Sequence, residues 1–489
     1  MEAKMFKVED YGAVGDGRTD DGKAISAAVA AAVADASPSK TVLLKKDTVY
    51  RVESVMEENE NNSIFSLNDG KNITISGSNT TLLVKSPVKL ATVIGCDNVE
   101  INGLVIDFSP KPFVLGHVTY ANAETGVVEF ETQKELGFEG DRFEAPDPFF
   151  AFPNTDEKRY HYFITSYEYL GEPSRYRMNI REDFRNRIKD VKIGDEFILP
   201  YVGASHHGGG GFLFTRNRDF RMKDCTILSL PEFGFDIRNN LGKGYFKNIR
   251  MVPDEKTGVK LVSWRDGFHV KDNLDQIVWE HCYIGPLGDD AFNLSCVQLD
   301  IQSIDGDGMT MRLLPAEAGN TRELLAGDEY VAYDVETCAY FGEGKLAEVY
   351  KSDDDVYIKL DKPLAGLNPG MQISIYRYAN QGYMIKDCYI EGTVRARGSG
   401  TFLNNTFNVF WVRVENEFFV EGPVPKDILF KDCTFTTLYD KDSEIFHVGT
   451  LGKAGTQQCE YKCKNIVLDN CQFLKGKIQV DDGNELIIR

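Results

Sequence analysis

The chain of 489 residues is poor in tryptophan, in cysteine and in positive charge. It has 3 Trp and 10 Cys, and its 55 basic side chains stand against 75 acidic ones, for a formal net charge of −20. So few cysteines in so long a chain exclude a small disulfide-rich scaffold. The acidic balance argues against a nucleic-acid partner, which requires a basic face. It also disfavours a polyanionic substrate, which the chain would repel at long range.

A long hydrophobic run is also missing. The longest apolar stretch, residues 24–34, is rich in alanine and too short to cross a bilayer. The first ten residues lack the apolar core of a secretion signal. We therefore expect no membrane partner, and either a cytoplasmic protein or an exported one whose leader has been removed. Hydrophobic residues still make up 42% of the chain, which is enough for a core and excludes general disorder.

One six-residue phrase recurs along the chain. Met222-Lys-Asp-Cys-Thr-Ile returns with small changes at 279–284, 385–390, 430–435 and 468–473, and Asn405 occupies the cysteine slot of a further copy. The pattern of apolar, polar, polar, small, polar, apolar suits a short strand entered from a tight corner. Coil after coil of this kind is typical of a parallel β-helix. We expect the repeated cysteines to form an inward ladder of buried, reduced thiols.

Two long stretches interrupt this rhythm and resemble each other. Val191-Lys-Ile-Gly-Asp-Glu-Phe-Ile in the first corresponds to Leu325-Ala-Gly-Asp-Glu-Tyr-Val in the second, and both stretches alternate apolar and polar residues as strands do. A single segment, 20–35, has the acidic start and the alanine-rich body of a helix. We therefore predict an all-β fold, a right-handed parallel β-helix with an N-terminal capping helix and two inserted small antiparallel β-barrels.

The same pattern divides the chain into five parts. Residues 1–114 are expected to form the capped N-terminal β-helix, 115–201 the first barrel, 202–296 the central coils with the catalytic acids, 297–378 the second barrel and 379–489 the C-terminal coils.

The strongest candidate for chemistry is a set of three aspartates. Asp266 and Asp289 are 23 residues apart, about the length of one coil, and Asp290 adjoins the second. Neighbouring coils stack about 4.8 Å apart, so the three carboxylates should lie together although they repel one another. Paired carboxylates cleave glycosidic bonds, one as the acid and the other as base or nucleophile. Two other interpretations stay open: polar turns capped by aspartate, and a calcium site.

Aromatic and polar residues near these acids are candidates for sugar binding. Trp264 lies two residues before Asp266, and Trp411 follows a repeat phrase on a later coil. A tryptophan face suits the C–H surface of a sugar, although either ring is equally well explained as a packing residue. His269, three residues after Asp266, is a candidate hydrogen-bond donor to a hydroxyl group, or else a scaffold residue.

Several motifs resemble known enzymes. Tyr11-Gly-Ala-Val-Gly-Asp-Gly-Arg-Thr-Asp is similar to the start of many pectin-lyase-like β-helix enzymes. The chain also resembles glycoside hydrolase family 110, which contains exo-acting, inverting α-1,3-galactosidases. That resemblance lies in the two insertions and in the motifs at 288–293, 394–398, 403–407 and 420–428.

The resemblance implies a set of site residues. The catalytic acids would be Asp266, Asp289 and Asp290. Sugar contacts would come from Asn293 at the end of the first motif, from Arg395 and Arg397, and from Glu421. We expect a terminal α-galactoside on an oligosaccharide or glycoconjugate as the partner, no cofactor and no metal, with a homodimer as one option for assembly.

Rival functions are separated by other motifs. A polygalacturonase should show Gly-His-Gly, which is absent, and Arg-Ile-Lys downstream of the acids, whereas the single copy begins at Arg187, upstream of them. A polysaccharide lyase needs a basic residue, for which Arg395 or Arg397 would be candidates. A non-catalytic β-helix, such as an adhesin, predicts no cluster of acids on adjacent coils.

Overall fold

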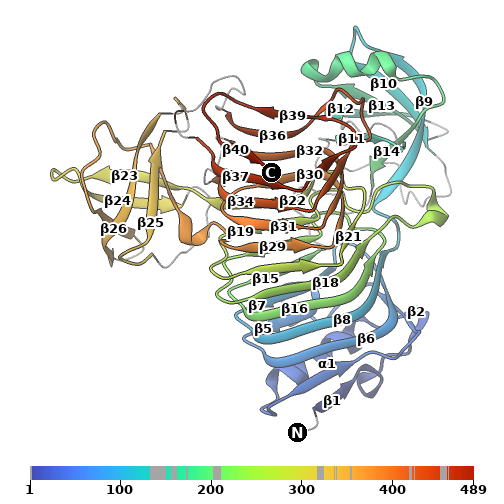
Figure 1. Ribbon diagram of the computed structural model, residues 1–489. Helices are drawn as coiled ribbons and strands as arrows, with labels where there is room; N and C mark the ends of the chain where they lie inside the picture. The colour runs from blue at the N-terminus through green and yellow to red at the C-terminus, as the bar shows by residue number, and fades with distance from the viewer. Residues whose placement is uncertain are drawn as a thin grey trace.

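The computed structural model describes residues 3–489 except 133–149, 156–161, 172–173, 202–210, 316–323, 335, 338, 353–354, 418–420, 423–424, 452–459 and 461. The described chain is a parallel β-helix that carries two closed barrels (Figure 1). This confirms the predicted fold class. In the part of the chain that the structure describes, no helix is both long and apolar enough to cross a membrane.

Twenty-eight strands form the coils of the β-helix. The N-terminal coils contain β1 (Lys4–Lys7), β2 (Asp16–Asp20), β3 (Lys40–Leu43), β4 (Val49–Val52), β5 (Ser63–Asn68), β6 (Lys71–Val84), β7 (Lys89–Ile94) and β8 (Asp97–Phe108). The central coils contain β15 (Phe212–Thr215), β16 (Arg218–Ile227), β17 (Phe235–Arg238), β18 (Gly244–Met251), β19 (Phe268–Lys271), β20 (Ile277–Glu280), β21 (Tyr283–Ile284) and β22 (Asp290–Val297).

The C-terminal coils complete the β-helix. They contain β29 (Tyr383–Lys386), β30 (Tyr389–Ala396), β31 (Gly400–Leu403), β32 (Thr406–Glu417), β33 (Glu421–Gly422), β34 (Lys426–Lys431), β35 (Thr434–Thr436), β36 (Glu444–Leu451), β37 (Lys464–Asp469), β38 (Gln472–Phe473), β39 (Lys477–Val480) and β40 (Leu486–Ile488). Four short 3-10 turns accompany the described strands, at Val8–Tyr11, Glu182–Asp190, Glu255–Thr257 and Tyr376–Tyr378.

The helix α1 (Gly22–Ala34) covers the N-terminal end of the coils, as the sequence predicts (Figure 1). Its apolar face, with Ile25, Val29 and Ala32, is buried in the main core. The acidic residues before it do not cap its first turn in the usual way. Asp21 accepts hydrogen bonds from the backbone N–H groups of Val14 and Gly15, and so fixes the preceding loop.

The two insertions are six-stranded closed barrels. The first contains β9 (Phe113–Asn122), β10 (Val127–Thr132), β11 (Phe150–Pro153), β12 (Tyr162–Gly171), β13 (Arg175–Ile180) and β14 (Glu196–Pro200). The second contains β23 (Leu299–Ile304), β24 (Thr310–Pro315), β25 (Glu329–Tyr333), β26 (Tyr340–Ser352), β27 (Asp355–Leu360) and β28 (Gln372–Ile375). They project from opposite sides of the C-terminal half of the β-helix (Figure 1).

The paired Gly-Asp-Glu segments form the same turn in both barrels. Gly194 and Gly327 each have φ of 92°, in the left-handed region that favours glycine. Each following aspartate folds its carboxylate back onto a backbone N–H three residues earlier, Asp195 onto Lys192 and Asp328 onto Leu325. The likeness seen in the sequence is therefore a local structural device that starts a barrel strand.

The repeated phrase produces a ladder of small side chains. In register, Cys282, Cys388, Asn405, Cys433 and Cys471 occupy successive coils, with hydrogen bonds that join each coil to the next. The eight cysteines that the structure describes are free thiols, and seven of them are buried. The prediction of an inward ladder of free thiols is confirmed for Cys282, Cys388 and Cys433, whereas Cys471 is half-buried and Cys225 is separated from Cys282 by a coil with Ile249 in that place.

A second ladder, made of asparagines, was not predicted. Asn217, Asn240, Asn273 and Asn380 lie on four successive coils and are 0% to 1% exposed. The side-chain oxygen of each of the last three accepts from the backbone N–H of the preceding asparagine, at 3.0 to 3.2 Å. The amide nitrogens donate to backbone carbonyls, such as Asn240 Nδ2 to Phe214 O. The ladder satisfies buried backbone groups at a corner and fixes the coil register next to the site.

Replacing Asn240 by alanine should destabilise the protein. The change leaves buried donors and acceptors on two coils without partners, at a cost of about 1–3 kcal/mol for each such group. Urea unfolding followed by circular dichroism measures the effect. Asn408→Ala is the matched control, since Asn408 is half-buried and donates to the Tyr389 hydroxyl group. Equal unfolding midpoints for the two variants would show that the ladder contributes no special stability.

Candidate active site

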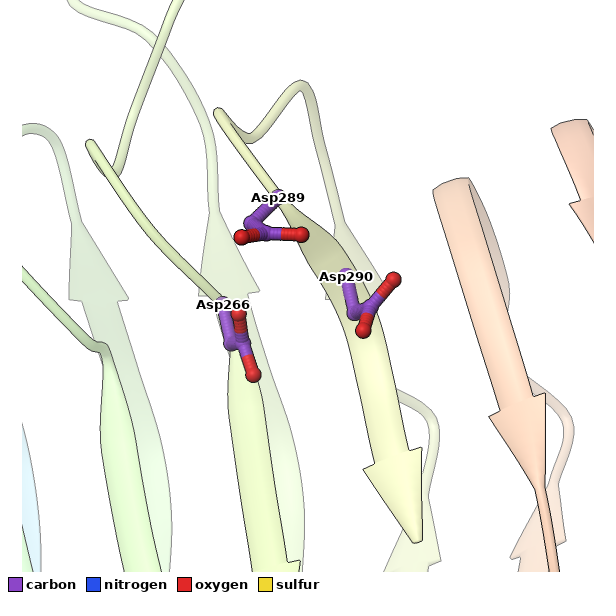
Figure 2. Close-up of side chains that lie close together, drawn as sticks. All are labelled: Asp266, Asp289 and Asp290. Carbon is purple, nitrogen blue, oxygen red and sulfur yellow. The ribbon is translucent and has the colours of Figure 1, made fainter. Parts of the chain in front are cut away.

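Stacking of the coils brings the three predicted acids together. Asp266 precedes β19, and Asp289 and Asp290 stand at the beginning of β22 on the next coil, with Phe268 in register with Phe292. One carboxylate oxygen from each aspartate lies within 4.8 Å of the others. Figure 2 shows the three side chains grouped where the two neighbouring strands begin. The acids therefore meet on adjacent coils as expected, but the register of 24 residues puts Asp290, and not Asp289, in line with Asp266.

A stack of aromatic rings holds these two coils in register. Phe235, Phe268 and Phe292 face the core on successive coils, with ring centroids 4.4 and 5.0 Å apart and nearly parallel planes. Each of the last two rings follows a catalytic candidate by two residues. These rings keep the two coils aligned, and a β-bulge between Asp290 and Phe292 breaks the alternation that would otherwise put that acid and that ring on the same face of the strand.

Each of the three acids has a basic partner. Arg265 Nη1 lies 3.1 Å from Asp289 Oδ2, Arg395 Nε lies 2.7 Å from Asp290 Oδ2, and His269 Nδ1 lies 2.7 Å from Asp266 Oδ2. These contacts offset part of the repulsion among the carboxylates.

Burial raises the pKa of two of the acids. Loss of solvation raises the pKa of Asp266, and the charge of Asp289 raises it further, against the hydrogen bond from His269. Loss of solvation also raises the pKa of Asp290 well above its usual value, although Arg395 opposes this. A carboxyl group with a raised pKa beside an ion-paired carboxylate is the division of roles that acid–base catalysis needs.

A second polar cluster surrounds Glu421. The Lys271 ammonium group lies 3.2 Å from its carboxylate and Arg397 Nη1 lies 3.3 Å from it, while Asn293 Nδ2 donates to it at 3.1 Å. Burial opposes its ionisation, but the charges of Lys271 and Arg397 hold the pKa of Glu421 well below its usual range. Arg397 is 0% exposed, so it positions Glu421 and Asn293 instead of presenting a free guanidinium group.

The two candidate tryptophans have opposite environments. Trp264 is 1% exposed and packs against Phe113, at 5.6 Å and stacked, and Phe152, at 5.2 Å and edge-on. Because both rings belong to the first barrel, Trp264 anchors that barrel on the β-helix. The prediction of a sugar-stacking role for Trp264 is corrected accordingly. Trp411 is 40% exposed.

Trp411 stands in line with the acids. It is in register with Thr393, which is in register with Asp290 one coil earlier. Trp411 is therefore two coils from Asp290, a backbone separation of about 9.6 Å at the usual strand spacing. The ring lies on the same outward row of the coils as the acid and is open to solvent.

Sequence reasoning missed Lys271 and the residues that follow Trp411. Lys271 lies two residues after His269, a spacing that puts both on the same face of a strand. Arg413 and Glu415 continue the outward row of β32 by the same spacing. A period-two reading of each strand after the acids were located would have found all three.

The acid cluster also has the chemistry of a cation site. Three carboxylate oxygens within 4.8 Å of one another are hard ligands of the kind that calcium and magnesium take. Asp266, Asp289 and Asp290 are the residues that would hold such an ion.

No protein-family model matches the chain, and no curated protein matches it in sequence. Among similar solved structures, ORF18 of Geobacillus virus E2 has 9% identity and a TM-score of 0.35 over 98% of this chain, which spans 61% of that protein's length. The surface adhesin PfbA of Streptococcus pneumoniae has 12% identity and a TM-score of 0.35, covering 99% of this chain and 93% of its own. A Thermotoga maritima exopolygalacturonase has 12% identity and a TM-score of 0.32, covering 100% and 92%. Similarity this low carries no argument about substrate.

Replacing Asp266 by asparagine should change stability in a pH-dependent way. Its pKa is raised on folding above the ordinary 3.8, so stability falls as the pH rises through the folded-state value, where the buried charge forms. The asparagine carries no charge and still offers an oxygen to His269. We expect a higher melting temperature than wild type in mildly alkaline buffer and a similar one in acid. Lower melting temperatures at both pH values would show that the ionised carboxylate stabilises the fold.

Proposed function

We propose that this protein is a glycoside hydrolase that removes a terminal α-linked galactose, with Asp266, Asp289 and Asp290 as its catalytic acids. The observation that carries the proposal is the grouping of three carboxyl groups within 4.8 Å on adjacent coils, two of them with raised pKa values. The resemblance to glycoside hydrolase family 110 supports the choice of sugar and linkage.

The contacts suggest a division of labour. Asp290 and Asp266, whose raised pKa values keep a proton available at higher pH, are candidates for donating a proton to the leaving oxygen. Asp289 is a quarter exposed and ion-paired with Arg265, which suits a carboxylate that activates water. Glu421, which its basic partners keep ionised, is a candidate acceptor for sugar hydroxyl groups.

The position of the barrels fits an enzyme that acts on chain ends. The first barrel reaches the acids closely, since a Cβ atom on Gly288 would lie 3.1 Å from the Phe152 ring and 2.1 Å from the Trp264 carbonyl oxygen. The second barrel begins at Leu299, two residues after β22. A wall beside the acids favours a pocket that takes one terminal sugar.

Removing either proposed acid should abolish most of the turnover. Asp266→Asn and Asp289→Asn each replace an ionisable group by one of nearly the same shape, and general acid–base help is worth roughly 10²–10⁴-fold. We expect galactose release from an aryl α-galactoside to fall by about 10³-fold. Asp224→Asn is the control, because Asp224 is an exposed coil-corner residue. Near-normal rates in both active-site variants would refute the site assignment.

The stereochemical outcome is a separate prediction. Inverting enzymes usually hold their two carboxyl groups about 6.5–9.5 Å apart, with water between them. The closest oxygens of this cluster lie within 4.8 Å, so inversion is supported by the family resemblance alone. We expect proton NMR of the first-formed sugar to show β-galactose from an α-galactoside. First appearance of the α anomer would establish retention.

A second candidate is a β-helix enzyme that acts on an acidic polysaccharide. Five basic side chains, Arg265, Lys271, Arg395, Arg397 and Arg413, lie on the face that carries the acids, which favours this alternative. Incubation with pectin decides between the two. Growing ultraviolet absorbance reports the unsaturated product of a lyase, whereas galactose release from a galactoside supports the leading proposal. New reducing ends without that absorbance would report a polygalacturonase-like hydrolase, and the absence of all three signals would favour a non-catalytic carbohydrate-binding β-helix.

A further inference from the structure

A chain of charged side chains continues from the acid cluster toward the C-terminal coils. The guanidinium group of Arg413 lies 3.8 Å from the centre of the Trp411 ring, and Arg413 Nη1 lies 3.0 Å from Glu415 Oε1. Glu415 Oε2 lies 2.8 Å from His447 Nδ1, and His447 Nε2 lies 3.1 Å from Asp481 Oδ2. These five residues are named the Trp411 cluster.

Three coils supply the cluster, and their register fixes its geometry. Trp411, Arg413 and Glu415 are alternate residues of β32, so all three face the same way. Arg413 is in register with His447 of β36, and Asp481 directly follows β39, whose residue Val480 is in register with Val448. Only Trp411 reaches far into solvent; Glu415 is 1% exposed at its side chain and Arg413 is 19% exposed.

A buried carboxylate needs a reason to be retained. Glu415 is taken out of water, and its charge is held by Arg413 on its own coil and by His447 on the next. These contacts hold the Arg413 guanidinium group in place, and that group lies over the indole ring of Trp411. A cation over a tryptophan face stabilises the ring in one orientation.

We propose that Trp411 and Arg413 form a second sugar-binding subsite, two coils from Asp290, and that Glu415 and His447 are positioning residues for it. This inference rests on the proposed function and extends it. The indole presents a flat apolar surface to the C–H face of a sugar ring, and the guanidinium edge offers donors to its hydroxyl groups. The occupant is the sugar unit on the leaving-group side of the scissile bond, since a terminal galactose occupies the acids.

Kinetics with one-sugar and two-sugar substrates test the subsite. An aryl α-galactoside fills only the acid site, whereas an α-linked digalactoside also reaches Trp411. We expect Glu415→Gln to raise KM for the digalactoside about two- to five-fold relative to KM for the aryl galactoside, the value of an exposed cation–π contact. Trp411→Ala should raise this ratio further. An unchanged ratio in both variants would overturn the proposal.

The control variant removes a carboxylate elsewhere in the same coils. Asp442 is exposed and pairs with Lys477 at 2.9 Å, outside the Trp411 cluster, so Asp442→Asn should leave the KM ratio as in wild type. A ratio raised by Asp442→Asn to the same extent as by Glu415→Gln would also overturn the proposal, because the effect would then be a general loosening of the coils.

Fluorescence separates this inference from the proposed activity. Trp264 and Trp279 are 1% and 0% exposed, so Trp411 is the tryptophan open to a quencher. The digalactoside should protect wild type from acrylamide quenching, and Glu415→Gln should need a higher sugar concentration for the same protection. If wild type hydrolyses neither substrate, the proposed function fails while protection still supports the subsite. Absence of protection in wild type overturns the subsite whatever the activity.

The pH dependence of Trp411 emission reports the positioning role. Burial lowers the pKa of His447, but the bonds to Glu415 and Asp481 raise it above its ordinary 6.5 overall. The protonated imidazole of His447 therefore donates to both Glu415 and Asp481 at low pH. When the pH rises through the raised pKa, the ring loses one N–H and one of the two carboxylates loses its donor. We expect an emission transition above pH 6.5 in wild type and none in His447→Gln. The same transition in both proteins would overturn the role of His447. The charged or titratable groups around it are Glu415, Arg413, Asp481, Cys463 and, on its own strand, Glu444.

Discussion

Hydrogen bonding of each coil onto the next, residue opposite residue, is the constraint on which this structure depends. It converts a distance along the chain into a place in space. Asp266 and Asp290 lie in line because 24 residues make this coil, with Asp289 adjoining, and Asp290 and Trp411 stand in one line because Thr393 lies in register between them. Two features keep that register from slipping. The phenylalanine rings stack in the core, and the asparagine side chains accept hydrogen bonds from buried backbone N–H groups.

The same stacking creates an electrostatic problem, which the site solves locally. Like residues placed one above another would put like charges about 4.8 Å apart. Arg395 does lie in register with Arg413 on the next coil, and opposite charges beside these groups offset the repulsion. Arg265 lies beside Asp289, Arg395 beside Asp290, Lys271 and Arg397 around Glu421, and Arg413 beside Glu415. Solvation, more than pairing, then separates the acids. Asp266 and Asp290 are buried and have raised pKa values, whereas Asp289 is the more exposed of the three.

Most of what could be predicted from the sequence came from the repeated six-residue phrase. The fold class, the cysteine ladder and the meeting of the three acids follow from the repeated phrase and the coil length, and the two barrels follow from the paired stretches that interrupt it. Trp264 shows where such reasoning stops, because its partners Phe113 and Phe152 come from an insertion more than a hundred residues earlier. The asparagine ladder was missed for a different reason: its members are 23, 33 and 107 residues apart, so no constant spacing marks them, and the hydrogen bonds between coils reveal the set.

Net charge is a weaker guide to the substrate than the arrangement of charges in the site. The net charge of −20 is spread over 489 residues, and dissolved salt screens its field beyond about 8 Å at physiological ionic strength, so an approaching sugar experiences little of it. Inside the site the charged groups are paired with each other, so a ligand is recognised by the direction in which their hydrogen-bond donors and acceptors point. The Glu421 carboxylate held by Lys271 and Arg397 presents acceptors. The Arg413 guanidinium group held over Trp411 presents donors at the edge of a flat ring. Fixed acceptors at one end and fixed donors beside an aromatic face at the other suit a ligand whose hydroxyl groups both donate and accept. A neutral sugar has that property.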